Sequence, residues 1–290
     1  MFQPSNWPKF WPTNKAITGK RIGLLLAMLT AGSHADDVYF WRDSRGQAHY
    51  SDRGHDLAQQ RYIDPGIAWL SIRHVIDGDT IVVSDNIHVR LLSINTPEIR
   101  RANKPGDPGG KQAKAALTAL VAGQRIRLEY DAERKDRYGR TLAQVFTESD
   151  VHVNAELLRQ GWAMLAIHPP NLNYLKELTA AQQHAEQQRL GIWAMPRYQA
   201  KASTSLNPDN DISGWQRLVG QVQSVKQGRK YLYLNLPGQV AARIALKQQH
   251  LFPNIKRWAG KTVEIRGWPR RQRQSFVVPL RHGSDILILH

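Results

Sequence analysis

Hydrophobic positions recur with two different periods along this chain, and they predict a mixed segment followed by an all-β segment. Between residues 67 and 195, short runs rich in β-branched residues indicate strands, while longer stretches with apolar positions three to four residues apart indicate helices. The expected strands are Ala68–His74, Thr80–Val83, Ile87–Ile94, Gln124–Tyr130 and Leu142–Phe146, and the expected helices are Gly110–Ala122, Val153–Gln160 and Asn173–Gln188. This order predicts an α+β domain built on a small barrel.

Strand-like alternation returns in residues 213–290 without helical periodicity. The expected strands are Leu218–Val225, Tyr231–Leu236, Ala241–Ala245, Thr262–Trp268, Ser275–Val278 and Asp285–Leu289. They predict a second, mostly-β domain. Residues 196–212, between the two domains, are rich in Ser, Asn, Asp and Pro. Such a composition buries little apolar surface and predicts a linker.

The first 35 residues have the pattern of an export signal. Lys20 and Arg21 precede the ten-residue apolar run Ile22–Ala31, and Ser33-His34-Ala35 supplies small residues at two of the three last positions. A basic end, a short apolar run and small residues predict a signal peptide cleaved near Ala35, so we expect an exported protein, periplasmic or secreted. Ten residues are too few to span a bilayer comfortably, and no stable membrane span is expected. An uncleaved anchor is the alternative.

Residues 36–56 follow the predicted signal and form a segment of their own. Val38–Asp43 and Ala48–Asp52 flank the turn Ser44-Arg45-Gly46, which predicts a small β-hairpin domain. The sequence Trp41-Arg42-Asp43, then Gly46, then His49-Tyr50-Ser51-Asp52 resembles a small domain of unknown function found behind signal peptides in bacterial envelope proteins. This resemblance implies an envelope location and leaves the chemistry open.

Composition narrows how these domains can be stabilised. The chain has 290 residues, of which 41% are hydrophobic, and this is enough for two compact cores. It contains no cysteine, which excludes disulfides and thiolate metal sites. A metal would therefore need oxygen or imidazole ligands.

Positive charge is concentrated at the C-terminal end of the chain. Residues 213–290 hold 14 Lys and Arg against 2 Asp and Glu, whereas residues 36–212 hold 22 of each. A basic protein with an ordinary solvated surface would not segregate its charge in this way. The pattern favours a polyanion-binding domain at the C-terminus.

Three polar clusters interrupt the strands of residues 67–195. They are Asp77-Gly78-Asp79-Thr80, the run from Arg90 through Asn95-Thr96-Pro97 to Glu98, and Asp136-Arg137-Tyr138-Gly139-Arg140. Each alone is typical of turn formers and surface ion pairs. Together they supply what phosphodiester hydrolysis requires, namely hard oxygen ligands for a cation, planar arginine forks that match phosphate oxygens, and a carboxylate to orient water.

These motifs, in this order and spacing, resemble the staphylococcal nuclease family. The match extends from about residue 72 to Trp193 and includes Val153–Gly161 and Gly191-Ile192-Trp193. The resemblance implies a five-stranded oligonucleotide/oligosaccharide-binding (OB) barrel with three helices. It also implies a Ca²⁺-dependent endonuclease that hydrolyses DNA, RNA or both to 3′-phosphorylated products, with one ion bound and Mg²⁺ or Mn²⁺ as alternatives.

The resemblance also assigns roles to individual positions. It implies catalytic roles for Arg90, Glu98 and Arg140, metal binding by Asp79, Asn95 and the carbonyl of Thr96, contacts to a substrate phosphate from Arg137 and Tyr138, and a place for Asp77 close to the metal. Two positions depart from the family pattern. Asn95 replaces a carboxylate, so we expect weaker Ca²⁺ binding, and Ile167 replaces a tyrosine that packs on the nucleotide base.

Two other classes of function compete with an enzyme. Some repeats of this family have lost catalysis, so the chain could be a catalytically weak nucleic-acid-binding scaffold of the envelope. Retention of Arg90, Glu98 and Arg140 argues against that alternative. The basic C-terminal domain could instead meet anionic lipid or polysaccharide. No obligate protein partner is evident.

Aromatic residues are interleaved with the basic residues of the C-terminal domain. We expect nucleic-acid contacts there from Tyr231, Tyr233, Trp268, Arg270, Arg271 and Arg273. Aromatic platforms within a positive groove are how OB-type barrels bind single strands. The segment resembles the OB-like domains appended to some bacterial nucleases, and we expect DNA or RNA as its partner. Some of these aromatic residues must instead belong to the core.

Overall fold

The structure is a computed structural model that divides into two compact units, residues 1–64 and residues 65–290, each described here by itself. It describes residues 38–42, 48–51, 59–61, 68–100, 105–207 and 214–289. The predicted export signal, residues 1–35, lies outside the described residues. None of the described helices combines the length and the apolar character needed to cross a membrane.

The first unit contains a small antiparallel sheet. Strand β1 (Val38–Arg42) pairs with β2 (Ala48–Ser51), with Trp41 opposite His49. Strand β3 (Gln59–Arg61) pairs with the other edge of β1 and gives the order β2-β1-β3. The sequence pattern does not predict β3, because its three residues are all polar and show no alternation.

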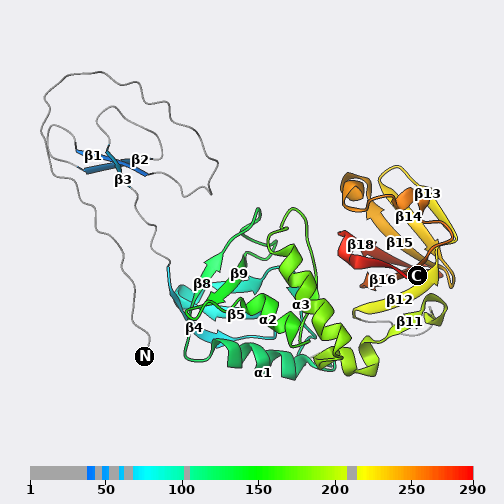
Figure 1. The fold of residues 1–290 in the computed structure, drawn as a ribbon, viewed down its shortest axis with the longest axis horizontal. Helices are drawn as coiled ribbons and strands as arrows, with labels where there is room; N and C mark the ends of the chain where they lie inside the picture. The colour runs from blue at the N-terminus through cyan, green and yellow to red at the C-terminus, as the bar shows by residue number, and fades with distance from the viewer. Residues whose placement is uncertain are drawn as a thin grey trace, which may run out of the picture. The chain divides into compact units, whose positions relative to one another are not determined.

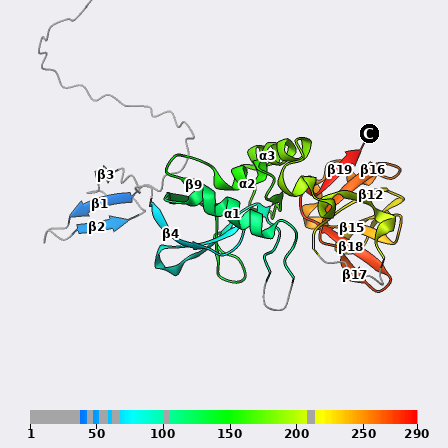
Figure 2. The same ribbon diagram turned by 90° about the horizontal axis from the view of Figure 1, so that it is seen from below.

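The second unit begins with a barrel domain, residues 68–195. Its closed barrel has the strand order β4-β5-β6-β9-β8, and the helices α1, α2 and α3 pack around it (Figures 1 and 2). The strands are β4 (Leu70–Val75), β5 (Thr80–Val83), β6 (His88–Leu91), β8 (Arg125–Glu129) and β9 (Thr141–Thr147), and the helices are α1 (Gly110–Val121), α2 (Val153–Arg159) and α3 (Leu175–Gln187). A short pair, β7 (Ile94–Asn95) with β10 (Met164–Leu165), lies beside the barrel. The predicted α+β barrel is confirmed.

Hydrophobic periodicity explains how the barrel and its helices bury a common core. Helix α1 buries Ala113, Leu117 and Val121, which are four residues apart and therefore share one face. Strand β5 is buried along its whole length, and α2 and α3 contribute Leu157 and Leu178 to the same core. The core therefore fixes the strand ends from which the polar clusters project.

The C-terminal β-module, residues 214–289 together with strand β11 at residues 200–202, consists of two sheets around one apolar core. Their orders are β11-β12-β16-β19 and β13-β14-β15-β18-β17. The strands are β11 (Ala200–Ala202), β12 (Gln216–Gln221), β13 (Ser224–Gln227), β14 (Tyr231–Leu236), β15 (Val240–Ala245), β16 (Thr262–Gly267), β17 (Arg270–Gln272), β18 (Ser275–Leu280) and β19 (Ile286–Leu289). The prediction of mostly-β structure is confirmed, but the strands form two sheets rather than one continuous closed sheet.

The predicted linker, residues 196–212, contains regular structure in its first part. Pro196–Tyr198 forms a 3₁₀ turn, and β11 pairs in parallel with β12. The Tyr198 ring is buried, and its hydroxyl donates a hydrogen bond to the Pro108 carbonyl at 2.7 Å. Tertiary contacts thus order a segment whose composition alone indicates a flexible connection.

A second core and a buried ion network join the barrel domain to the C-terminal β-module. Trp193, just after α3, packs edge-on against Trp215 with ring centroids 6.0 Å apart. Arg266 of β16 makes two contacts with Glu186 of α3, at 2.6 and 2.8 Å, and a third with Glu264 at 2.6 Å. Both views show α3 and the turns after it beside the C-terminal sheets (Figures 1 and 2). The two parts are therefore docked on each other.

Candidate active site

The turn between β4 and β5 places two carboxylates below the barrel surface. Asp77 and Asp79 are each only 6% exposed. Gly78 between them lies so close to Thr96 that an added Cβ would come within 2.6 Å of its hydroxyl. Any side chain at this position would push the turn away from Thr96. Glycine therefore allows the first polar cluster to contact the second.

Arg90 joins these two clusters. Its Nη2 lies 3.0 Å from Asp79 Oδ2 and donates a 3.0 Å hydrogen bond to Asn95 Oδ1. The Thr96 backbone N–H and hydroxyl also donate to Asp79 Oδ2, at 3.0 and 3.2 Å. The Arg90 side chain is 15% exposed, so these charge-assisted bonds lie largely out of water, where they are stronger. One end of the barrel thus holds a preorganised arginine.

The paired carboxylates influence each other electrostatically. Burial and the negative charge of Asp79 raise the pKa of Asp77, although the Asp79 backbone N–H, Thr80 and Arg90 partly oppose this shift. Asp77 Oδ1 accepts the Asp79 backbone N–H at 3.2 Å. Two carboxylates in one buried turn create negative potential that a cation would relieve.

The loop between β8 and β9 supplies the third cluster. Asp136 accepts hydrogen bonds from the Arg140 side chain at 2.7 Å and from the backbone N–H groups of Tyr138 and Arg140. Partial burial works against these bonds, but the net result is that Arg140 and the backbone donors lower the pKa of Asp136. Asp136 therefore remains ionised and holds Arg140 in place. Tyr138 is 69% exposed, and Arg137 lies over its ring.

Glu98 lies in the turn that follows Thr96, and its side chain is exposed. Asp107 brackets the backbone of this residue, accepting the Glu98 N–H at 3.2 Å and donating its own N–H to the Glu98 carbonyl at 2.8 Å. Gly110, at the start of α1, packs so closely that an added Cβ would meet that carbonyl at 2.4 Å. The backbone position of Glu98 is therefore fixed.

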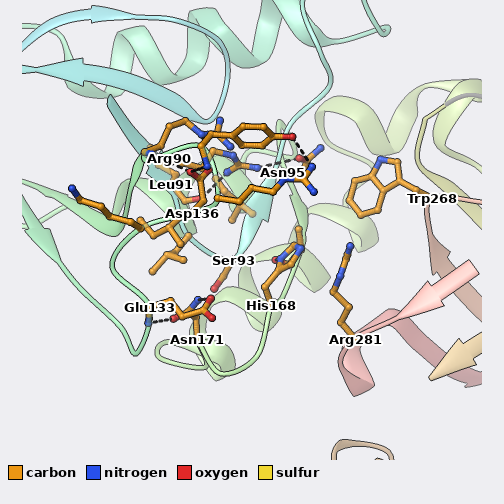
Figure 3. A pocket seen from close by; sticks show the side chains of 18 of the residues that line it. Arg90, Leu91, Ser93, Asn95, Glu133, Asp136, His168, Asn171, Trp268 and Arg281 are labelled. Carbon is orange, nitrogen blue, oxygen red and sulfur yellow. Dashed lines mark hydrogen bonds and ion pairs between the residues drawn. The ribbon is translucent and has the colours of Figure 1, made fainter. Parts of the chain in front are cut away.

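A cavity of about 620 Å³ brings most of the predicted residues together (Figure 3). The sequence-predicted residues that line it are Arg90, Asn95, Arg137, Tyr138 and Arg140 of the barrel domain, with Trp268 and Arg270 of the C-terminal β-module. Asp79 and Thr96 are connected to it through Arg90 and Asn95. Glu98 is not among the lining residues. We call this space the interdomain cleft, because both parts of the second unit line it.

The other residues predicted for the C-terminal β-module are dispersed. Tyr231 lines a neighbouring cavity of about 370 Å³ with Arg243, Arg270 and Arg281. Tyr233 and Arg273 line a separate cavity, and Arg271 lines none of the three. The predicted set is therefore not a single groove.

His168 and Arg281 are among the residues of the interdomain cleft that sequence reasoning missed. Burial and the nearby Arg281 lower the pKa of His168, and its Nδ1 lies 2.8 Å from the Ala166 carbonyl. A neutral ring with that proton leaves Nε2 as an acceptor. Neither residue belongs to a motif, so no local signal could have identified them. The neighbouring Ile167 is buried in the core and cannot replace a base-stacking tyrosine.

The oxygen atoms of Asp79, Asn95 and Thr96 suit a hard cation such as Ca²⁺ in their chemistry. Asp79 is buried beside a second carboxylate, which favours positive charge there. Asn95 Oδ1 and Asp79 Oδ2 both contact Arg90, and Asn95 Nδ2 donates to the Thr96 carbonyl at 3.0 Å. Among the described residues, no group of three or more histidine or acidic side chains is arranged to hold a metal ion. A cation here would therefore need mixed carboxylate, amide and carbonyl oxygens as ligands.

Comparison with known proteins agrees with this geometry. The family described as staphylococcal nuclease homologue matches residues 88–195, and a domain of unknown function (DUF4124) matches residues 25–62. The chain is 41% identical over 125 residues to a thermonuclease of Staphylococcus intermedius, which covers 42% of this chain and 74% of that protein. Over 123 residues it is 37% identical to a thermonuclease of Staphylococcus hyicus, covering 41% and 72%. Endonuclease YncB of Bacillus subtilis (strain 168) is 34% identical over 134 residues, covering 44% and 63%. The chain belongs to the staphylococcal nuclease family.

Proposed function

We propose that this chain is an exported, metal-dependent nuclease that hydrolyses phosphodiester bonds of DNA, RNA or both. One observation carries the proposal. Arg90 and Arg140 line the same cavity, and each is held by a carboxylate, Asp79 and Asp136 respectively. Relatives named thermonuclease and endonuclease support the same class of reaction.

The two arginines would stabilise the negative charge that develops on the phosphoryl oxygens during hydrolysis. A guanidinium offers a planar fork that matches two phosphate oxygens. Arg90 is mostly buried, and its contacts with Asp79 and Asn95 hold the guanidinium at the cavity before a substrate binds. Arg140 is oriented by Asp136 in the same manner. Tyr138 and Arg137, beside Arg140, would contact a second phosphate of the substrate.

Glu98 would orient the attacking water and accept its proton. In this reaction a bond forms between the water oxygen and phosphorus, the bond from phosphorus to the 5′ oxygen breaks, and that oxygen takes up a proton from solvent. The products are a 3′-phosphate and a 5′-hydroxyl. The fixed backbone of Glu98 limits the positions its carboxylate can reach, which supports a positioning role.

Asp79, Asn95 and the Thr96 carbonyl would hold the cation. A bound Ca²⁺ would supply Lewis-acid polarisation of the phosphate. Arg90 shares both Asp79 Oδ2 and Asn95 Oδ1 with any such ion, so it would keep only part of its present contacts. Because Asn95 carries an amide where a carboxylate would carry a negative charge, we expect this set of ligands to bind Ca²⁺ less tightly than a set with two carboxylates.

The proposal of export rests on the basic, apolar and small-residue pattern of residues 1–35. The match of residues 25–62 to a separate small domain also supports a domain that precedes the nuclease. Secretion and localisation in the periplasm are both compatible with the pattern.

The test is cleavage of single- and double-stranded DNA and RNA by the purified chain in Ca²⁺, Mg²⁺, Mn²⁺ or EDTA, with analysis of the product ends. We expect metal-dependent cleavage that leaves 3′-phosphates. Binding without cleavage in every metal would contradict the enzyme and favour the scaffold alternative. 5′-Phosphate ends would contradict the proposed bond cleavage.

A further inference from the structure

The interdomain cleft has walls from two regions that are distant in sequence. Arg90 and Asn95 lie on the barrel wall, while Trp268 and Arg281 come from the C-terminal β-module and lie across from them (Figure 3). His168 lies between the two walls. The cavity is within the range of roughly 300–1,000 Å³ that ligand sites occupy. The catalytic residues therefore open into a larger binding space.

The cleft is strongly cationic. Its lining contains six basic residues and two acidic residues, namely Arg90, Lys135, Arg137, Arg140, Arg270 and Arg281 against Glu133 and Asp136. Asp136 is already engaged by Arg140, and Glu133 accepts a hydrogen bond from Asn171. The remaining positive potential suits a ligand that carries several negative charges.

Arg270 and Arg281 are the two cations that the C-terminal β-module contributes to the cleft. Within residues 68–100, 105–207 and 214–289, neither guanidinium forms a hydrogen bond or an ion pair. Burial lowers the pKa of Arg281, and the neighbouring Arg270 lowers it further, while Asp285 partly compensates. Two adjacent cations without direct counter-charges, one of them half-buried, form a prepared anion site.

The neighbouring cavity extends this surface. It shares Glu133, His168, Arg270, Pro279 and Arg281 with the interdomain cleft, and it continues to Tyr231 and Arg243. The Arg243 guanidinium lies 4.6 Å from the centre of the Tyr231 ring. A path of alternating cationic and aromatic groups therefore leads from Arg90 past Trp268 and Arg281 to Tyr231.

We propose that the C-terminal β-module completes the substrate site, and that the interdomain cleft binds a single-stranded polynucleotide extending from the scissile phosphate. This inference rests on the proposed nuclease function. Phosphates contact Arg270 and Arg281, and an unpaired base stacks on Trp268. A duplex keeps its base faces covered, whereas a single strand can present them to an aromatic side chain. Trp268 thus offers the aromatic surface that the buried Ile167 does not.

The barrel domain and the C-terminal β-module contact each other directly, and these contacts support a cleft whose two walls have a fixed arrangement. Arg266, Glu264 and Glu186 form a mostly buried network across the interface. Arg197 also donates to the Trp215 carbonyl at 3.0 Å. Because these contacts hold β16 against α3, Trp268 and Arg270, which follow β16, have a defined position relative to the barrel.

The experiment measures binding of a twelve-nucleotide single-stranded DNA to the full chain in EDTA across a salt series. Arg270→Ala and Arg281→Ala are compared with Arg257→Ala, which removes the same charge from an exposed position of the same module outside the three cavities. We expect each cleft variant to lose affinity and to flatten the slope of log affinity against log salt by roughly 0.7. Arg257→Ala should change neither by a comparable amount.

Trp268→Leu tests stacking while it preserves apolar packing against Trp193 and its neighbours. We expect about tenfold weaker binding of the single strand. Equal effects from Arg257→Ala and the two cleft variants would overturn the proposal, since binding would then depend on diffuse charge. Duplex DNA bound as tightly as the single strand would also overturn it.

Cleavage of a dinucleotide, measured in parallel with metal, separates this inference from the proposed function. A dinucleotide contains one scissile phosphate and no extended strand, so we expect the unmodified chain and Arg257→Ala, which lies outside the three cavities, to cleave it at the same rate. If no cleavage occurs but the cleft variants still bind the single strand more weakly than Arg257→Ala does, the proposed nuclease function is contradicted and the single-strand site is supported. Normal cleavage with no difference among the variants in binding would contradict only the cleft.

Discussion

The barrel domain and the C-terminal β-module pair their strands in the same way but use buried charge differently. In the barrel and in the five-stranded sheet of the module, successive strands pair antiparallel and one parallel pair follows, β6 with β9 in the barrel and β15 with β18 in that sheet. The buried charges of the barrel, around Asp79 and Arg90, connect to a cavity. Those of the module, Arg266 and Glu264, engage α3 and each other.

This difference shows that strand topology alone does not decide the role of a β-module. Two domains with similar strand pairing can differ in function, because function depends on which side chains the strand ends carry. In the barrel, charge is preorganised where a substrate can reach it. In the module, part of the charge is used for docking, and the rest is left exposed or directed into the cleft.

The largest expected effect comes from removing the charge at the barrel end. The double variant Arg90→Ala/Arg140→Ala should lose activity by more than the roughly 10²–10³-fold typical of one transition-state donor. Rates on a single-stranded oligonucleotide, with circular dichroism to verify folding, provide the measurement. Near-native cleavage by this variant would end the enzyme account. Arg125→Ala, an exposed barrel position, is the charge-matched control.

The second effect concerns the docking charges. Arg266→Ala leaves Arg217, 2.8 Å from Glu264 and 3.9 Å from Glu186, as the remaining cation of both carboxylates, and breaking a buried pair in this way costs about 3 kcal/mol. We expect that decrease in the free energy of unfolding, measured by urea denaturation. The same Arg125→Ala control, whose ion pair is exposed, should show no resolvable change. Equal stability of both variants would mean that the network does not hold the interface.

The third effect tests the proposed cation site. Asn95→Asp adds an anionic oxygen beside Asp79, so half-maximal cleavage should require several-fold less Ca²⁺. Asn86→Asp adds the same charge at an exposed loop position and serves as the control. A Ca²⁺ titration of activity supplies the measurement. If Asn95→Asp requires as much Ca²⁺ as the unmodified chain, or more, Asn95 is not a ligand.

The smallest expected effect concerns how the free energy of unfolding of the barrel domain depends on pH. His152 is buried against Phe146, and this burial lowers its pKa despite the hydrogen bond to Glu177. The folded state then binds a proton less readily than the unfolded state. His152 therefore contributes stability above pH 6.5, which is lost as pH falls toward its lowered pKa. We expect His152→Gln to reduce the loss of stability between pH 7 and 5.

Unfolding by urea at several pH values provides the comparison, with His88→Gln, an exposed substitution on β6, as the control. The relevant quantity is the slope of stability against pH, because His152→Gln also alters packing. An unchanged slope in His152→Gln would contradict the proposed contribution of this histidine.

Hydrophobic periodicity predicts most of the barrel domain, because each of its helices and strands has in its own sequence the apolar spacing of the element that it forms. Helix α1 was predicted within one residue of its observed end, and β5 matched at both ends. Composition does not predict strand β11, because pairing with β12 and burial of Tyr198 order a segment that is otherwise polar. Such long-range contacts leave no local signal.

In the candidate site, too, residues that belong to contiguous motifs can be predicted from the sequence, whereas residues brought in by tertiary contacts cannot. The motifs around Asp79, Arg90 and Arg140 could be found because each is contiguous and their chemistry is recognisable. Arg281 could not be found, since only the docking of a module more than one hundred residues away brings it near His168. Glu186 belongs to no motif, and only the structure pairs it with Arg266.

The central claim is that the C-terminal β-module forms one wall of the substrate site. Photocrosslinking of single-stranded DNA carrying 5-bromodeoxyuridine at successive positions, bound to the full chain in EDTA, tests it most directly. We predict crosslinked peptides that contain Trp268 at one or two adjacent positions of the strand, and their loss in Trp268→Leu. Crosslinks confined to residues 68–195, at every position of the strand, would contradict the claim.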